Sequence, residues 1–214
     1  MNRTIAVVFA IALLAAPATA SAAGDPHVFD KAAYAAASAR ARTGEAPPPD
    51  YLWLRQQRAA RDSFIEGHWD AFKEADSLID SNPARALDLA RARMADNWTE
   101  LMPHLVARIA LRKLGRDDEA AKENDAVRGI LESVTAGKHG TSDTDAFNAV
   151  TSGEEYPVLM LMGIRMNRQA LVPKDGHTFD VMTGTDRDGK SHEIWFNIDF
   201  FFGREGGIDK LLKN

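Results

Sequence analysis

The chain has 214 residues, of which 27% are charged, and its formal net charge is −5. That negative balance argues against nucleic acid and anionic lipid as partners. Because the sequence contains no cysteine, disulfides, a lipoprotein anchor and thiol catalysis are excluded, and core packing has to hold the folded chain together.

The first 23 residues have the pattern of a cleaved secretory signal peptide. Arg3 precedes an apolar run from Ile5 to Ala16, which is too short for a stable membrane span. Two small-x-small cleavage sites follow, at Ala18–Ala20 and Ser21–Ala23. We therefore expect residues 1–23 to be removed on export. The expected location is the periplasm, with the extracellular space as the alternative, and no integral span is expected in the mature chain.

The mature chain divides into three predicted parts. Residues 24–50 are rich in alanine and proline, with a helix expected as far as about Arg42, before three consecutive prolines. Residues 51–136 show helical periodicity almost throughout, and residues 137–214 predict shorter helices and strands. The predicted fold class is therefore α+β. It consists of N-terminal antiparallel helical hairpins, followed by a small three-stranded antiparallel β-meander with short helices.

Local signals mark helix ends within residues 51–136. Asn82-Pro83 predicts an N-cap followed by proline at the first helical position. Gly115 predicts the end of a helix, and an acidic first turn follows at residues 117–119. The segment Pro83–Leu87 lies 34 residues ahead of Asp117–Ala121, which is the period of tetratricopeptide repeats. We predict one or two degenerate tetratricopeptide-like hairpins.

Residues 137–214 predict a mixed unit of helices and strands. Short helices are expected from 143 to 150 and from 153 onward, with a final one around 208–212. Three strands are expected at 169–172, 177–183 and 192–199. Their connections contain Asp175-Gly176 and Asp188-Gly189, dipeptides that favour hairpin turns.

The segment from Gly184 to Ser191 fits the phosphate-loop pattern G-x-x-x-x-G-K-S. A phosphate loop needs a helix after it, whereas Ile194, Phe196 and Ile198 alternate with polar residues as in a strand. The loop also carries two aspartates, which would repel phosphate. We interpret the segment as a hairpin and expect no nucleotide.

No common metal or catalytic motif occurs in the sequence. None of the six histidines lies three or four residues from another, and there is no H-E-x-x-H motif or G-x-S-x-G elbow. Asp186-x-Asp188-Gly189 resembles part of a calcium loop, but Gly184 and Trp195 occupy two of its main ligand positions. We therefore expect no metal, no cofactor and no identifiable catalytic residue.

Several motifs resemble the exported bacterial family called domain of unknown function 4919. They are Phe29-Asp30-Lys31, Gly115–Ala120, Gly140–Phe147, Glu154-Glu155-Tyr156, His177–Val181 and Ile194–Asp199. The resemblance extends over nearly the whole mature chain and is most specific from Gly140 to Asp199. It implies the fold and the exported location, and it assigns no activity and no catalytic residue.

The candidate site is a polar face of the predicted sheet. Asp180, Trp195, Asn197 and Asp199 alternate with apolar residues, so we expect them on one face. Glu155 is expected on the same side of this unit. Such a face would bind sugar or peptide through stacking on tryptophan and hydrogen bonds to the carboxylates. The alternative is an ordinary solvated sheet face, with Trp195 covered by a helix.

The first functional hypothesis is a non-enzymatic binding or envelope-associated module that takes a protein or peptide. Degenerate helical hairpins offer concave faces, and no catalytic constellation competes with that interpretation. The alternative is a periplasmic hydrolase or transferase that uses Asp180, Asn197 and Asp199. A structural role at the cell surface is a third hypothesis. The first two differ in whether the sheet face lies in a cleft with converging carboxylates or stands open to solvent.

Overall fold

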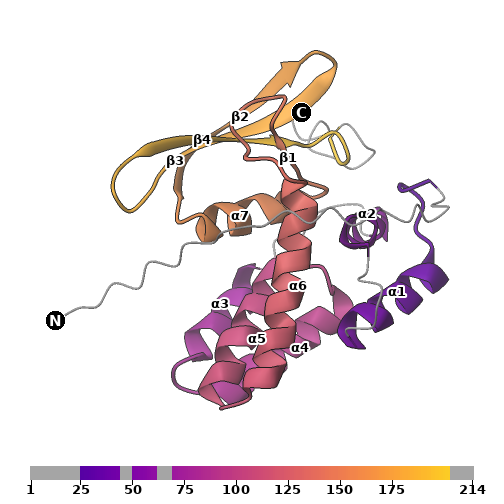
Figure 1. Cartoon of the computed structure of the whole chain (residues 1–214), viewed down its shortest axis with the longest axis vertical. Helices are drawn as coiled ribbons and strands as arrows, with labels where there is room; N and C mark the ends of the chain where they lie inside the picture. Colours follow the sequence, from indigo (N-terminus) through magenta and orange to yellow (C-terminus); the bar gives the residue numbers. More distant parts are fainter. Residues whose placement is uncertain (1–24, 44–49, 62–68, 203–214) are drawn as a thin grey trace.

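The computed structural model describes residues 25–43, 50–61 and 69–202, and it combines a layer of helices with a mixed β-sheet (Figure 1). The helical layer consists of α1 (Lys31–Thr43), α2 (Tyr51–Arg61), α3 (Trp69–Leu78), α4 (Pro83–Asp96), α5 (Leu101–Lys113) and α6 (Asp117–Thr135). The second unit consists of β1 (Phe147–Asn148), the 3-10 turn η1 (Ser152–Glu154), α7 (Glu155–Leu161), β2 (Arg165–Lys174), β3 (His177–Thr185) and β4 (Ser191–Asn197). The predicted α+β class is confirmed. The expected signal peptide and final helix lie outside the described residues.

The local signals for helix ends are confirmed. The Asn82 side chain accepts a hydrogen bond from the backbone N–H of Arg85 at 3.1 Å, with Pro83 as the first residue of α4. Gly115 follows α5 with a φ of 69°, a conformation that glycine adopts readily. The acidic first turn of α6 starts at Asp117. These ends depend on neighbouring residues alone, which is why the sequence predicts them well.

Alanines allow the helices to pack closely. Helices α4, α5 and α6 contact one another in chain order, and α3 packs on α4. The buried core between them contains Ala86, Ala90, Ala107, Ala110 and Ala120. A methyl side chain lets helix axes approach without large loss of packing contacts. None of the helices in the described ranges is both long and apolar enough to cross a bilayer.

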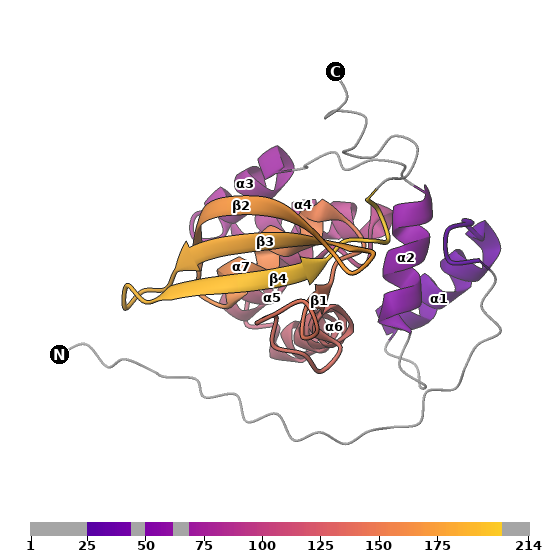
Figure 2. The same cartoon turned by 90° about the horizontal axis from the view of Figure 1, so that it is seen from above.

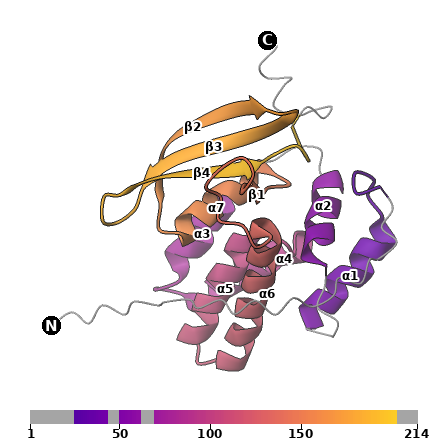
Figure 3. The same ribbon diagram turned by 45° about the horizontal axis from the view of Figure 1, so that its top comes forward.

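The sheet has four strands in the order β1-β4-β3-β2, and it lies above α7 and the helical layer (Figures 1 and 3). The predicted meander is present as β2, β3 and β4, which pair antiparallel. The prediction of a purely antiparallel, three-stranded sheet is wrong, because β1 adds to β4 in parallel. The prediction of a helix over 143–150 is also wrong, because this range contains β1. Asp145 instead closes a loop by accepting from the backbone N–H of His139 at 3.1 Å, and Phe147 packs on Phe196 in β4.

Both hairpins form at the predicted dipeptides. Asp175 and Gly176 have φ values of 50° and 81°, as a two-residue turn requires. In the second hairpin, the Asp186 side chain accepts from the backbone N–H groups of Asp188 and Lys190, both at 3.0 Å. The stretch that fits the phosphate-loop pattern is therefore a β-hairpin, as predicted.

Both faces of the sheet are covered. The inner face contributes Met182, Ile194 and Phe196 to a core that includes Val134 of α6 and Val158 of α7. The outer face carries Phe179 and Val181, which pack with Ala146 of the loop between α6 and β1. Figure 2 shows the view down onto this sheet, with the helices beneath it. Apolar residues of β3 therefore point to both faces of the sheet.

Arg55 of α2 joins the helical layer to the sheet unit. Its buried guanidinium donates to the two carboxylate oxygens of Glu154 at 2.9 and 2.6 Å. It also donates to the Asn148 carbonyl at 2.7 Å and to the Ser133 hydroxyl at 3.1 Å. The backbone N–H of Val150 donates to the same Glu154 carboxylate at 2.9 Å. Helices α2 and α6 and the beginning of the sheet unit thus meet at one buried cation.

Gly140 fixes the loop that covers the outer face, so its replacement by alanine is expected to be costly. Its φ is 73°, and an added Cβ would lie 2.8–3.0 Å from ring atoms of Phe147. Its carbonyl also accepts from the backbone N–H of Trp195 at 2.8 Å. We expect Gly140→Ala to lower the free energy of unfolding by about 2–4 kcal/mol.

Urea denaturation followed by circular dichroism measures this effect, and Gly137→Ala is the matched control. Gly137 has a φ of 75° in the same loop, but an added Cβ there meets nothing within 4 Å. The control should lose only the strain of the left-handed conformation, about 1 kcal/mol. Equal losses in the two variants would show that the contact with Phe147 contributes nothing.

Candidate functional site

The sheet register separates the residues predicted to share one polar face. Asp180 is paired with Phe196, and Val181 is paired with Trp195. Paired residues on antiparallel strands point to the same side, so Asp180 belongs to the inner face and Trp195 to the outer one. Asn197, paired with Phe179, is also on the outer face. The prediction of a single face is therefore wrong, because a shift of one residue in register exchanges the two sides.

Asp180 and Glu155, two of the predicted residues, do come together beneath the sheet. Glu155 at the start of α7 is 0% exposed and Asp180 in β3 is 2% exposed. Gln169 of β2 donates to one oxygen of Asp180, and the Tyr156 hydroxyl donates to Gln169 at 3.0 Å. This chain of contacts leads from the buried pair to the exposed side of β2.

Burial shifts the titration of both carboxyl groups in the same direction. Burial raises the pKa of Glu155 well above its usual range, and the charges of Asp180 and Glu154 raise it further. Burial also raises the pKa of Asp180, against the hydrogen bond from Gln169 that lowers it. Neither carboxylate oxygen of Glu155 has a hydrogen-bond partner among the described residues, and Asp180 Oδ1 has none either. Burial without such partners favours the neutral form of Glu155. Because both groups are covered, a substrate does not reach them in this conformation.

The remaining three predicted residues fasten strands together. Trp195 packs edge-on against Phe179 with ring centroids 5.6 Å apart, and the loop before β1 covers this part of the outer face. Asp199 accepts from the backbone N–H of Thr178 at 2.7 Å and from Asn197 Nδ2 at 3.1 Å, and its carboxylate lies 2.5 Å from His177 Nδ1. These contacts join the end of β4 to the start of β3. Structural contacts of this kind explain why polar residues occur at these positions, and no ligand is needed to explain them.

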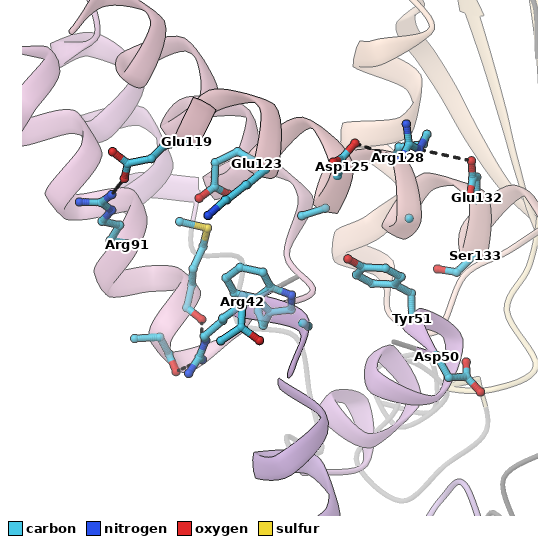
Figure 4. Close-up of a pocket in the computed structure, with 18 of the residues that line it drawn as sticks. Arg42, Asp50, Tyr51, Arg91, Glu119, Glu123, Asp125, Arg128, Glu132 and Ser133 are labelled. Atoms are coloured by element: carbon cyan, nitrogen blue, oxygen red, sulfur yellow. Dashed lines mark hydrogen bonds and ion pairs between the residues drawn. The ribbon is translucent and has the colours of Figure 1, made fainter. Parts of the chain in front are cut away.

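A pocket of about 1060 Å³ lies elsewhere, between the α1–α2 pair and helices α4 and α6 (Figure 4). Its walls are the last turn of α1, the first turn of α2, the C-terminal half of α4 with Trp98, and one side of α6. The residues of this site come from separate helices and form no motif, so the sequence alone does not reveal it. The only signal was the general expectation of concave faces on helical hairpins.

Gly129 of α6 shapes one wall of the pocket. A Cβ at this position would lie 2.2–2.8 Å from the ring of Tyr51, so only glycine lets α2 approach α6 this closely. Glycine in a helix costs about 1 kcal/mol relative to alanine, and here the close approach compensates for it. Burial, and then the charge of Asp125, raises the pKa of the Tyr51 hydroxyl. The ring is thereby held neutral at the pocket wall.

Most acidic side chains in the pocket already have a basic partner or a local role. Glu119 pairs with Arg91 at 2.8 Å, and Glu123 contacts His104 at 2.6 Å. Asp125 and Glu132 both face Arg128, at 3.0 and 3.9 Å. Asp50 accepts from the backbone N–H of Trp53 at 2.9 Å and caps the start of α2. Across the described ranges, no group of three His, Cys, Asp or Glu is placed to hold a metal ion.

Comparison with known proteins identifies the family. No curated protein and no solved structure matches the chain. A family model matches residues 62–203, which is more than half of the sequence. The match leaves out the Phe29-Asp30-Lys31 opening, so it is narrower than the expected coverage of nearly the whole mature chain. It contains α3 to α7 and the complete sheet. The chain therefore belongs to the family described as Domain of unknown function (DUF4919).

Proposed function

We propose that this protein is an exported, non-enzymatic binding module that takes a peptide or protein segment in the pocket between α1–α2 and α4–α6. The observation that carries the proposal is the pocket itself. Its volume of about 1060 Å³ is at the upper limit for small-molecule sites, and it leaves room for a segment of several residues. The signal-peptide pattern of residues 1–23 supports export, with the periplasm as the proposed location.

The lining of the pocket suits a peptide. Tyr51 and Trp98 offer aromatic surface, while basic and acidic side chains surround them. Peptide ligands present amide groups, charged side chains and apolar side chains together, so a wall of mixed character matches them. The antiparallel hairpins beside the pocket are of tetratricopeptide-like character in this proposal, supported by the 34-residue spacing between Pro83–Leu87 and Asp117–Ala121. Stacked helical hairpins commonly bind peptides on such concave surfaces.

The alternative hydrolase or transferase has less support. It would use Asp180, Asn197 and Asp199 as one group, and these residues lie on different sides of the sheet or tie strands together. The Glu155–Asp180 pair, between the start of α7 and β3, is buried. The geometry therefore favours the binding module over an enzyme at the sheet.

Filling the pocket tests the proposal. Ala95 lines the pocket near the end of α4, and Ala92, one turn earlier, does not. Fluorescence anisotropy with labelled random heptapeptides measures binding to the mature protein. We expect Ala95→Trp to weaken binding about tenfold or more, because the indole occupies the space, whereas Ala92→Trp binds like the parent.

Thermal unfolding of both tryptophan variants checks that they remain folded. Binding that survives Ala95→Trp unchanged would place the ligand elsewhere. The absence of any peptide binding to the folded parent would overturn the proposed function.

A further inference from the structure

Strand β2 is a free edge of the sheet. The strand order ends with β2, and no strand among the described residues pairs with its other side (Figure 2). Alternate residues of such an edge direct their backbone N–H and C=O groups away from the sheet. Pro173 indicates which residues these are, because proline lacks the N–H and occurs in edge strands where that group would face outward. Gln169 and Leu171 lie four and two residues earlier in a regular part of the pairing, so their backbone groups also point outward.

Two arginines lie on the outer side of this edge. Arg165 and Arg168 pair with Thr185 and Thr183 of β3, which belong to the outer face with Val181. Both arginines are exposed. Neither of them forms an ion pair or a side-chain hydrogen bond with any residue that the structure describes. Two guanidinium groups are therefore available to pair with incoming carboxylates.

The charges around these arginines leave the edge basic. Strand β2 contains no acidic residue, and its third base, Lys174, pairs with Asp143 at 2.8 Å. The turn at residues 186–190, next to Arg165, contains two acids and two bases, so their charges balance. Glu193 of the same face belongs to β4 and is separated from β2 by a whole strand. A second copy of the chain pairing through β2 would bring like charges together, whereas an acidic strand would neutralise them.

The inner side of the same edge is apolar. Leu171 pairs with Asp180 of the inner face, and it is 37% exposed. Helix α7 contacts β2 from beneath, and the Tyr156 hydroxyl donates to Gln169 at 3.0 Å. Met160 lies one turn further along the same side of α7 and is 48% exposed. A strand added here would direct every second side chain to this apolar side and the others to the arginines.

We propose that the free edge of β2 binds an extended segment of a partner protein in which acidic and apolar residues alternate. The segment adds to the sheet as a further strand, and its backbone pairs with Gln169 and Leu171. Its acids pair with the two arginines, and its apolar side chains lie on Leu171 and Met160. This site is separate from the pocket between the α1–α2 pair and helices α4 and α6, so the inference does not depend on the proposed function.

Three labelled octapeptides test the alternating pattern. The probe alternates glutamate and valine, and its first control has the same composition with all glutamates before all valines. The second control alternates lysine and valine. Fluorescence anisotropy measures their binding to the full mature protein at constant ionic strength. We expect the probe to bind at least about tenfold more tightly than either control, because only the probe matches both sides of the edge.

Variants locate the peptide on β2. Arg165→Gln and Arg168→Gln are each expected to weaken binding about three- to tenfold, whereas Arg85→Gln, which removes an exposed base of α4, should leave it unchanged. Leu171→Pro removes an outward N–H at a position where an edge strand tolerates proline, and we expect it to weaken binding about tenfold. Leu171→Ala keeps the N–H, so it should bind more tightly than Leu171→Pro. Thermal unfolding checks that each variant is folded.

The pocket variant Ala95→Trp separates this inference from the proposed function, because it should bind the probe like the parent. Weaker binding in Ala95→Trp would overturn the inference, since the probe would then lie in the pocket. No binding of the probe, equal binding of the three peptides, or unchanged binding in Arg165→Gln and Arg168→Gln would also overturn it. If sedimentation shows that the free protein is a dimer that Leu171→Pro dissociates, a second copy occupies the edge and the inference is wrong.

Discussion

Replacing Arg55 with methionine is expected to lower the free energy of unfolding by about 3–5 kcal/mol. The Arg55 side chain is 0% exposed, and its partner Glu154 is 16% exposed. Methionine keeps an unbranched apolar stem but leaves the Glu154 carboxylate without its cation. The Asn148 carbonyl and the Ser133 hydroxyl also lose their donor. Because these groups join α2 and α6 to the sheet unit, the contact between the two layers is expected to weaken first.

Urea denaturation at neutral pH measures the loss, with the slope of the transition as a check on two-state unfolding. Arg128→Met is the matched control, because both members of the Arg128–Asp125 pair are 63% exposed. Exposed pairs of this kind contribute about 0–1 kcal/mol. The double variant Arg55→Met/Glu154→Gln should recover part of the loss, since the unpaired charge is removed. A single-variant loss no larger than that of Arg128→Met would show that the buried pair does not stabilise the interface.

The second large effect is a pH dependence that Glu155→Gln is expected to remove. The pKa values of Glu155 and Asp180 are both raised above their ordinary values of 4.5 and 3.8. The folded chain therefore holds a proton that the unfolded chain releases once the pH exceeds these ordinary values. The stabilising contribution of this bound proton is complete below the ordinary pKa values, and it is lost as the pH rises through the folded-state pKa values.

Glutamine supplies the missing donor at every pH, because its amide donates to Asp180 without a titrating proton. We expect the free energy of unfolding of Glu155→Gln to exceed that of the parent by about 1–3 kcal/mol at pH 8. At pH 4 the two values should be nearly equal. Urea denaturation at pH 4, 6 and 8 measures the two curves. Glu193→Gln, at an exposed position of β4, is the control, and its free energy of unfolding should change with pH as that of the parent does. If the free energy of unfolding of Glu155→Gln also changes with pH as that of the parent does, the buried pair does not take up a proton on folding.

Local signals explain why the helix ends and hairpins were predictable. The Asn82-Pro83 cap, the glycine after α5 and the two Asp-Gly turns each depend on residues that are neighbours in sequence. The strand β1 depends instead on a partner some fifty positions away, since Phe147 pairs with Phe196. Two residues are too few to show a strand period.

The candidate face was mispredicted for a different reason. Alternation assigns residues to faces reliably when one side of a sheet is solvated. Here a loop covers the outer side, so Phe179 and Val181 are apolar without pointing to the main core, and Asp180 points inward. The five-residue loop between β3 and β4 pairs Thr185 with Ser191 and so fixes the register. The register decides which residues of the two strands share a face. The pocket required the arrangement of four helices, which no local pattern contains.

The strand order has a consequence for how the molecule is made. The last strand of the described chain, β4, lies between β1 and β3 and is not at an edge. During synthesis from the N-terminus, the helical layer is complete while the sheet still lacks an interior strand. Until residues 191–197 arrive, β1 has no partner, the inner core lacks Ile194 and Phe196, and the loop at Gly140 has no Trp195 amide to hold it. Shortening the chain before β4 would therefore remove the middle of the sheet, and the protein commits to its folded state late in its synthesis.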